Sequence, residues 1–64
     1  MASERYLIAM ERQIRAKMFL IKTKKVTPKD SGIGILLNNL KNFDEALYEN
    51  LLIEYKKILE NINH

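Results

Sequence analysis

Four basic residues in the first third of the chain have a spacing that would place them on one surface. They are Arg5, Arg12, Arg15 and Lys22. Drawn as an α-helix, they fall within roughly 100° of arc and flank Ile8 and Phe19. Clustered cations release counterions from nucleic acid, and arginine can also reach bases, so one interpretation is a phosphate-contacting face. The other is a solvated helix face whose field Glu4 and Glu11 partly neutralise.

The charge is divided unevenly along the chain. Residues 1–32 hold eight Lys or Arg and three acidic residues, a net +5, whereas residues 33–64 hold three lysines and five acidic residues, a net −2. A standard helix-turn-helix would read DNA with the start of its last helix. Here that helix opens with Asp44 and Glu45, which phosphates would repel. If the protein binds nucleic acid, we therefore expect the first helix to make the contact.

Few residues could support catalysis or hold a metal. There is no cysteine, and the only histidine is the terminal His64, so neither a nucleophile–base pair nor a transition-metal site is expected. Glu45, Glu49 and Glu60 are spread along one solvated face. The glycines of residues 31–34 lack the lysine and preceding strand of a phosphate-binding loop; close helix packing or a flexible helix start explains them. We expect no enzyme, no cofactor and no catalytic, cofactor-binding or metal-binding residue.

The strongest amphipathic pattern lies at the end of the chain and predicts a helix over residues 43–62. Asn42 is the expected N-cap, with Glu45 returning its hydrogen bond in a capping box. Eight apolar residues recur at three- and four-residue steps and share roughly 140° of arc. They are Leu47, Tyr48, Leu51, Leu52, Tyr55, Ile58, Leu59 and Ile62. Ile53 projects from the opposite face.

The first helix is predicted over residues 3–24, with Ser3 as its N-cap. Its apolar residues form a narrow seam with steps of three and four residues, which resembles a coiled-coil contact. The seam consists of Leu7, Met10, Ile14, Met18 and Ile21. Phe19 lies to one side of the seam and Leu20 nearly opposite it, so this helix has apolar groups on more than one side.

A shorter helix is predicted between them, over residues 28–40. Thr27 would be its N-cap and Pro28 its first residue. Gly32 and Gly34 weaken the first turns by about 1 kcal/mol each relative to alanine. The alternative leaves residues 27–32 as a loop and starts the helix after Gly32.

The expected fold class is all-α, with one small domain over residues 1–64. Two long amphipathic helices would form an antiparallel hairpin with the short helix between them, and two such hairpins would dimerise into a helical bundle that buries the surplus apolar surface. The seam of the first helix should face Leu51, Tyr55, Ile58 and Ile62. The longest uncharged run, residues 31–40, is too short to span a membrane. Without a signal-peptide pattern, we expect a soluble cytoplasmic protein.

These observations favour a non-enzymatic protein-interaction module, namely a regulator, inhibitor or adaptor that binds a protein partner and itself. Tyrosine and exposed apolar residues are typical of such surfaces. The candidate interface residues are Leu7, Met10, Ile14, Met18, Phe19, Leu20, Ile21, Tyr48, Ile53 and Tyr55. The alternative is a nucleic-acid-binding accessory protein that uses the basic face of the first helix.

Overall fold

The computed structural model describes residues 2–62, with side chains from residue 4 onward, and all regular structure in this part is helical. The helices are α1 (Ala2–Lys22), α2 (Pro28–Ser31), α3 (Ile33–Phe43) and α4 (Glu45–Ile62). The predicted all-α class is therefore confirmed. The helix ends differ from the predicted ranges 3–24, 28–40 and 43–62, and the capping residues explain why. The side chain of Ser3, the predicted first cap, lies outside the described ones.

Helix α1 ends two residues earlier than predicted, because a lysine adopts the left-handed conformation. Lys24 has φ 63°. The N–H of Lys25 donates to the Leu20 carbonyl at 2.9 Å, and that of Lys24 donates to the Ile21 carbonyl at 3.0 Å. These two bonds are the Schellman arrangement, in which glycine usually takes the left-handed position. The pattern of apolar residues gives no sign of this stop.

The middle segment contains both of the alternative helix starts. The Thr27 Oγ accepts a hydrogen bond from the Asp30 N–H at 3.2 Å, which confirms the cap of a helix that begins at Pro28. Gly32 has φ 72°, which ends α2 after one turn. Helix α3 then starts at Ile33, whose N–H donates to the Ser31 Oγ at 3.1 Å. A Cβ added to either glycine would meet no atom within 4 Å, so close helix packing does not explain them.

Asp44 alone connects α3 to α4. Its N–H donates to the Leu40 carbonyl at 2.8 Å and closes α3. Its carboxylate accepts from the Leu47 N–H at 3.0 Å, which is an N-cap bond. The expected cap, Asn42, lies inside α3 instead, so that prediction is wrong. A carboxylate at the N-cap also gains from the helix dipole, which an amide does not.

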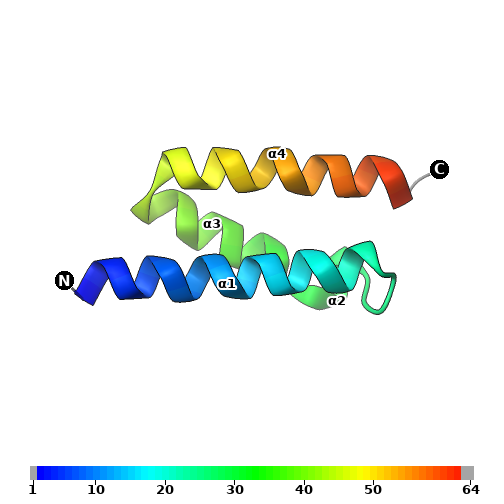
Figure 1. Cartoon of the computed structure of the whole chain (residues 1–64), viewed down its shortest axis with the longest axis horizontal. Coiled ribbons are helices and arrows are strands. Elements are labelled where there is room, and N and C mark those ends of the chain that lie inside the picture. The colour runs from blue at the N-terminus through cyan, green and yellow to red at the C-terminus, as the bar shows by residue number, and fades with distance from the viewer. Residues whose placement is uncertain (1, 63–64) are drawn as a thin grey trace.

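The chain reverses direction twice, as Figure 1 shows. Helices α1 and α4 run in the same direction, and α3 returns between them and packs against both. The antiparallel pairs are therefore α1 with α3 and α3 with α4, and the predicted hairpin of the two long helices is not formed. The physical reason is the length of α3, whose 11 residues extend about 16 Å as helix and carry the chain back along the bundle.

Eight buried residues form the core, and three helices contribute them unequally. They are Met10, Ile14, Met18, Ile21, Ile33, Leu37, Leu40 and Leu51. The predicted seam of α1 thus packs inside a single chain, and Tyr55, Ile58 and Ile62 pack against this core while remaining partly exposed. From α4 only Leu51 is fully buried. The apolar stripe of α4 is therefore incompletely covered.

The molecule is long and thin, with Cα extents of 41 × 19 × 14 Å. It exposes 4899 Å² of accessible surface. A monomer of this mass, 7.5 kDa, should expose about 4,250 Å². The chain therefore leaves more surface in water than is usual for its size.

Candidate interaction surfaces

The structure separates the predicted interface residues into two groups. Met10, Ile14, Met18 and Ile21 are buried in the core of one chain, so they offer no free surface. Leu7, Leu20, Tyr48 and Tyr55 are half-buried, and only two of the ten are exposed large apolar side chains. These two are Phe19, 60% exposed, and Ile53, 55% exposed.

Four further exposed side chains were not among the predicted interface residues. Tyr6, Ile8, Ile35 and Phe43 are each about half exposed or more, and Ile35 reaches 70%. The signal for Ile35 was present in the sequence, because it lies opposite the apolar stripe of its own helix at 100° per residue. Phe43 was predicted to begin the last helix, but it is the last residue of α3, so its position on the outward side of α3 was not foreseen.

The first surface is the outward side of α3, which we call the α3 face. It consists of Ile35, Asn38, Asn39, Asn42 and Phe43, all exposed and all uncharged. Tyr6 of α1 extends it, because its ring meets that of Phe43 edge-on with centroids 5.1 Å apart. Lys41 is turned away, and its Nζ lies 5.7 Å from the centre of the Tyr48 ring on α4.

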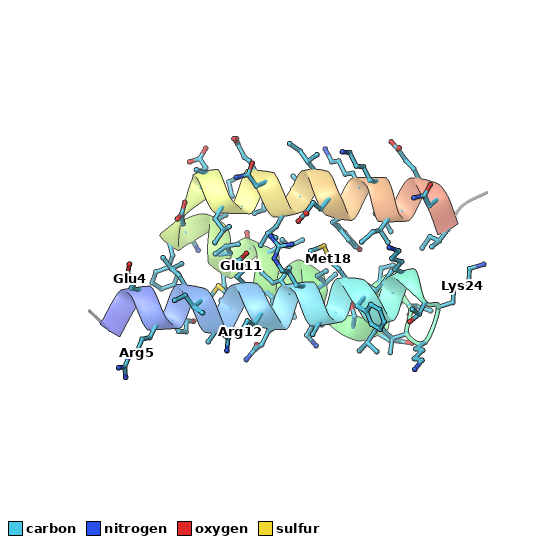
Figure 2. The ribbon with its side chains drawn as sticks, in the orientation of Figure 1. Glu4, Arg5, Glu11, Arg12, Met18 and Lys24 are labelled. Carbon is cyan, nitrogen blue, oxygen red and sulfur yellow. The ribbon has the colours of Figure 1, made fainter. Side chains whose placement is uncertain are left out.

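The second surface is the basic stripe of α1. It consists of Arg5, Ile8, Arg12, Arg15, Phe19 and Lys22, which are exposed and follow one another at steps of three and four residues. Figure 2 shows Arg5 and Arg12 pointing away from α4. The four predicted nucleic-acid-contacting cations thus follow one stripe of the helix, in which Arg15 and Lys22 lie toward α4 and two exposed apolar side chains interrupt the cations.

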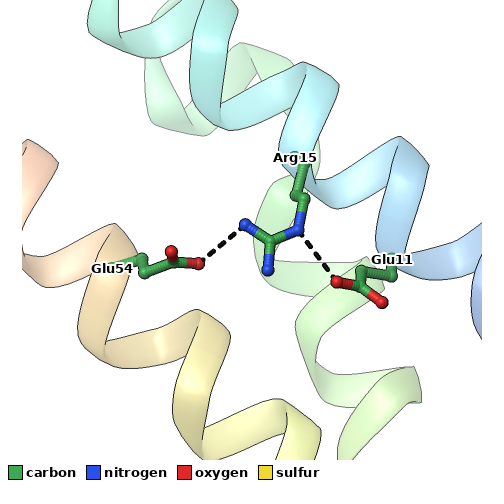
Figure 3. Close-up of polar contacts among 3 residues, drawn as sticks. All are labelled: Glu11, Arg15 and Glu54. Atoms are coloured by element: carbon green, nitrogen blue, oxygen red, sulfur yellow. Dashed lines mark hydrogen bonds and ion pairs between the residues drawn. The ribbon is translucent and has the colours of Figure 1, made fainter.

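Arg15 is the cation of this stripe that already has partners. Its Nε donates to Glu11 at 2.9 Å, and its Nη1 donates to Glu54 of α4 at 3.0 Å (Figure 3). The hydrogen bond to Glu11 raises the pKa of Arg15, and the charge of Glu54 adds to this, against the opposing effect of burial. Arg15 therefore stays protonated, and the two neighbouring carboxylates largely compensate its positive charge. Of the four predicted contacts, Arg5, Arg12 and Lys22 remain as cations without such partners among the described residues.

The third surface is a groove of ≈ 450 Å³ between α1 and α4, which we call the α1–α4 groove. Arg15, Met18, Phe19 and Lys22 line it from α1. Glu54, Lys57, Ile58 and Asn61 line it from α4. Figure 2 shows Met18 pointing into the space between the two helices. The groove has an apolar floor and predominantly basic edges.

Within residues 2–62, no group of three or more histidine, cysteine or acidic side chains is placed to hold a metal ion. No helix in that part is long and apolar enough to cross a membrane. His64, the only histidine of the sequence, lies outside the described residues.

Comparison of the chain with known protein families, with curated proteins and with solved structures found no match.

Proposed function

We propose that this chain is a non-enzymatic protein-interaction module that pairs with a second copy of itself through the α3 face and acts by binding a protein partner. The observation that carries this proposal is an uncharged surface on which Ile35 is 70% and Phe43 57% exposed. Interfaces are depleted in charge and enriched in aromatic side chains at their centres. The large accessible surface of so small a chain adds support.

The α3 face suits a second copy because a symmetric dimer places the same surface on both sides of its interface. Two basic stripes of α1 would repel each other. On α4, Ile53 lies among exposed charged side chains, namely Glu49, Lys56, Lys57 and Glu60, and such charges are depleted at the centres of interfaces. The asparagines of the α3 face carry no charge, and each amide both donates and accepts hydrogen bonds, so identical copies can pair.

The dimer is expected to be weak because its interface buries few apolar side chains. Burying the exposed part of each Ile35 and Phe43 contributes roughly 1–2 kcal/mol per side chain. Association and side-chain ordering oppose this contribution. We therefore expect a weak dimer, which suits a module that exchanges between itself and a partner.

Sedimentation velocity over a range of concentrations, from about 1 µM to 500 µM, tests the proposal. The wild-type chain should shift from monomer to dimer, and Ile35→Asp should remain a monomer with unchanged helix content. Ile53→Asp is the matched control, because Ile53 is similarly exposed but lies on α4; this variant should dimerise normally. A wild-type chain that stays monomeric throughout, or an equal effect of both substitutions, would refute pairing through the α3 face.

A further inference from the structure

We propose that the α1–α4 groove binds an amphipathic helix of a partner protein, whose apolar residues enter the groove and whose flanking carboxylates meet its lysines. This inference rests on the proposed function and specifies the class of partner.

The groove offers an apolar floor with an aromatic side chain at its edge. Met18, 4% exposed, and the half-buried Ile58 form the floor. Phe19 stands beside them and is 60% exposed. A side chain of this size gains from burial against apolar atoms, which a row of phosphates does not supply. The groove is therefore shaped for apolar side chains of a partner.

The charge of the groove sets the charge of that partner. Its lining holds the cations of Arg15, Lys22 and Lys57 and one carboxylate, Glu54. Glu54 is bound to Arg15. Among the described residues, neither Lys22 nor Lys57 has a carboxylate within 4.0 Å. These two lysines come from opposite walls, so carboxylates on both sides of a bound helix would find a partner.

The walls also determine the backbone conformation of the occupant. Both walls are helices, whose N–H and C=O groups are already paired within each helix. A bound extended segment would gain no backbone hydrogen bonds from them, whereas a helix satisfies its own. Residues 15–22 of α1 and 54–61 of α4 each extend about 10 Å, so the groove takes two turns of a partner helix. It would then be a fourth helix beside α1, α3 and α4.

Arg15 argues for a protein partner over nucleic acid on this surface. Glu11 and Glu54 hold its guanidinium at 2.9 and 3.0 Å. These carboxylates border the basic stripe at Arg15 and compensate the charge of that arginine, so a phosphate chain that followed the stripe would meet fewer free cations. Binding to nucleic acid is accordingly the competing outcome of the test.

Fluorescence anisotropy with two labelled 18-residue peptides tests the inference on the full chain. The first peptide carries leucine at steps of three and four residues, flanked by glutamate; its twin has lysine in place of each glutamate. The acidic peptide should bind at least tenfold more tightly than its twin. Phe19→Ser should weaken it at least tenfold, and the double variant Lys22→Glu/Lys57→Glu should reverse the preference between the peptides.

The double variant Lys25→Glu/Lys56→Glu is the matched control, because it changes the net charge equally with exposed lysines outside the groove. It should retain the preference for the acidic peptide. Equal binding of both peptides, or an equal effect of the two double variants, would overturn the groove as the binding site. Circular dichroism verifies that each variant keeps its helix content.

Two further measurements distinguish helix binding in the groove from nucleic-acid binding and from self-association through the α3 face. A labelled DNA oligonucleotide that binds more tightly than the acidic peptide, and is released by Arg5→Ala/Arg12→Ala, would overturn the inference in favour of nucleic acid. Sedimentation of the same samples reports on the α3 face independently. If the chain dimerises but does not bind the acidic peptide, only the proposal of groove binding is refuted. If the chain binds the peptide but stays monomeric, only the proposal of self-association is refuted.

Discussion

Arg15 of α1 and Glu54 of α4 are 39 positions apart in the chain, and their side chains meet at 3.0 Å across the open side of the bundle (Figure 3). Both side chains are about half exposed. The pair joins the two helices that run in the same direction, at one end of the α1–α4 groove. It therefore helps to set the width of the groove while contributing little to stability.

The first prediction concerns this ion pair. Exposed pairs contribute about 0.2–1 kcal/mol, so a double-mutant cycle with Arg15→Gln and Glu54→Gln should give a coupling free energy in that range from urea unfolding. Because the pKa of Arg15 is raised, the contribution of its charge to stability is full below the ordinary pKa of arginine and declines only above it. High salt should reduce the coupling. A value of several kcal/mol would mean that the pair is far more protected from water than its exposure indicates.

The second prediction contrasts the two glycines. Gly32 has φ 72°, where an alanine is strained, so Gly32→Ala should destabilise the chain by about 1 kcal/mol. Gly34 lies within α3 and is exposed, so Gly34→Ala should stabilise it by up to about 1 kcal/mol. Neither added Cβ meets an atom within 4 Å, so backbone conformation alone sets the sign. Thermal unfolding monitored by circular dichroism measures both; equal signs would contradict the left-handed turn at Gly32.

The sequence predicted the helices well because their apolar residues follow the helical period over many turns. It placed the helix ends less well, because single residues decide them. Nothing in the apolar pattern marks Lys24 as a left-handed residue, and Asn42 and Asp44 are both good caps only two positions apart. The Thr27 cap and the helix start at Pro28 were predicted correctly, but the continuous helix over residues 28–40 was not, because the left-handed Gly32 ends α2 after one turn.

The surfaces formed by one helix could be predicted from the sequence, whereas the groove between two helices could not. Arg5 and Arg12 share one side of α1 because helical geometry alone places them there. The α1–α4 groove depends on which helices lie side by side, and that is a property of the whole core. A second reversal of the chain sets α1 parallel to α4, and only then do Lys22 and Lys57 line the same groove. Periodicity within one helix carries no information on this arrangement.

The third prediction tests the observed cap of α4. Asp44 Oδ1 accepts a hydrogen bond from the Leu47 N–H at 3.0 Å. Asp44→Ala should therefore lower the free energy of unfolding by about 1 kcal/mol, the usual contribution of an N-cap side chain. Asn42 is exposed inside α3, so Asn42→Ala is the matched control and should change stability by less than about 0.5 kcal/mol. Urea unfolding of the two variants at low protein concentration compares their free energies of unfolding. If Asn42→Ala lowers this free energy more than Asp44→Ala does, Asn42 is the N-cap, as the sequence suggested.

The fourth prediction concerns alkaline pH. Partial burial raises the pKa of Tyr55 above its ordinary value of about 10, because the phenolate is poorly solvated there. A folded-state pKa above the unfolded one means that the unfolded chain releases this proton first. The contribution of neutral Tyr55 to stability is thus complete below pH 10 and is lost as the pH rises through the folded-state pKa. Tyr55→Phe cannot ionise, so its melting temperature should fall less than that of the wild type between pH 8 and pH 11. Equal falls would place Tyr55 in full contact with water.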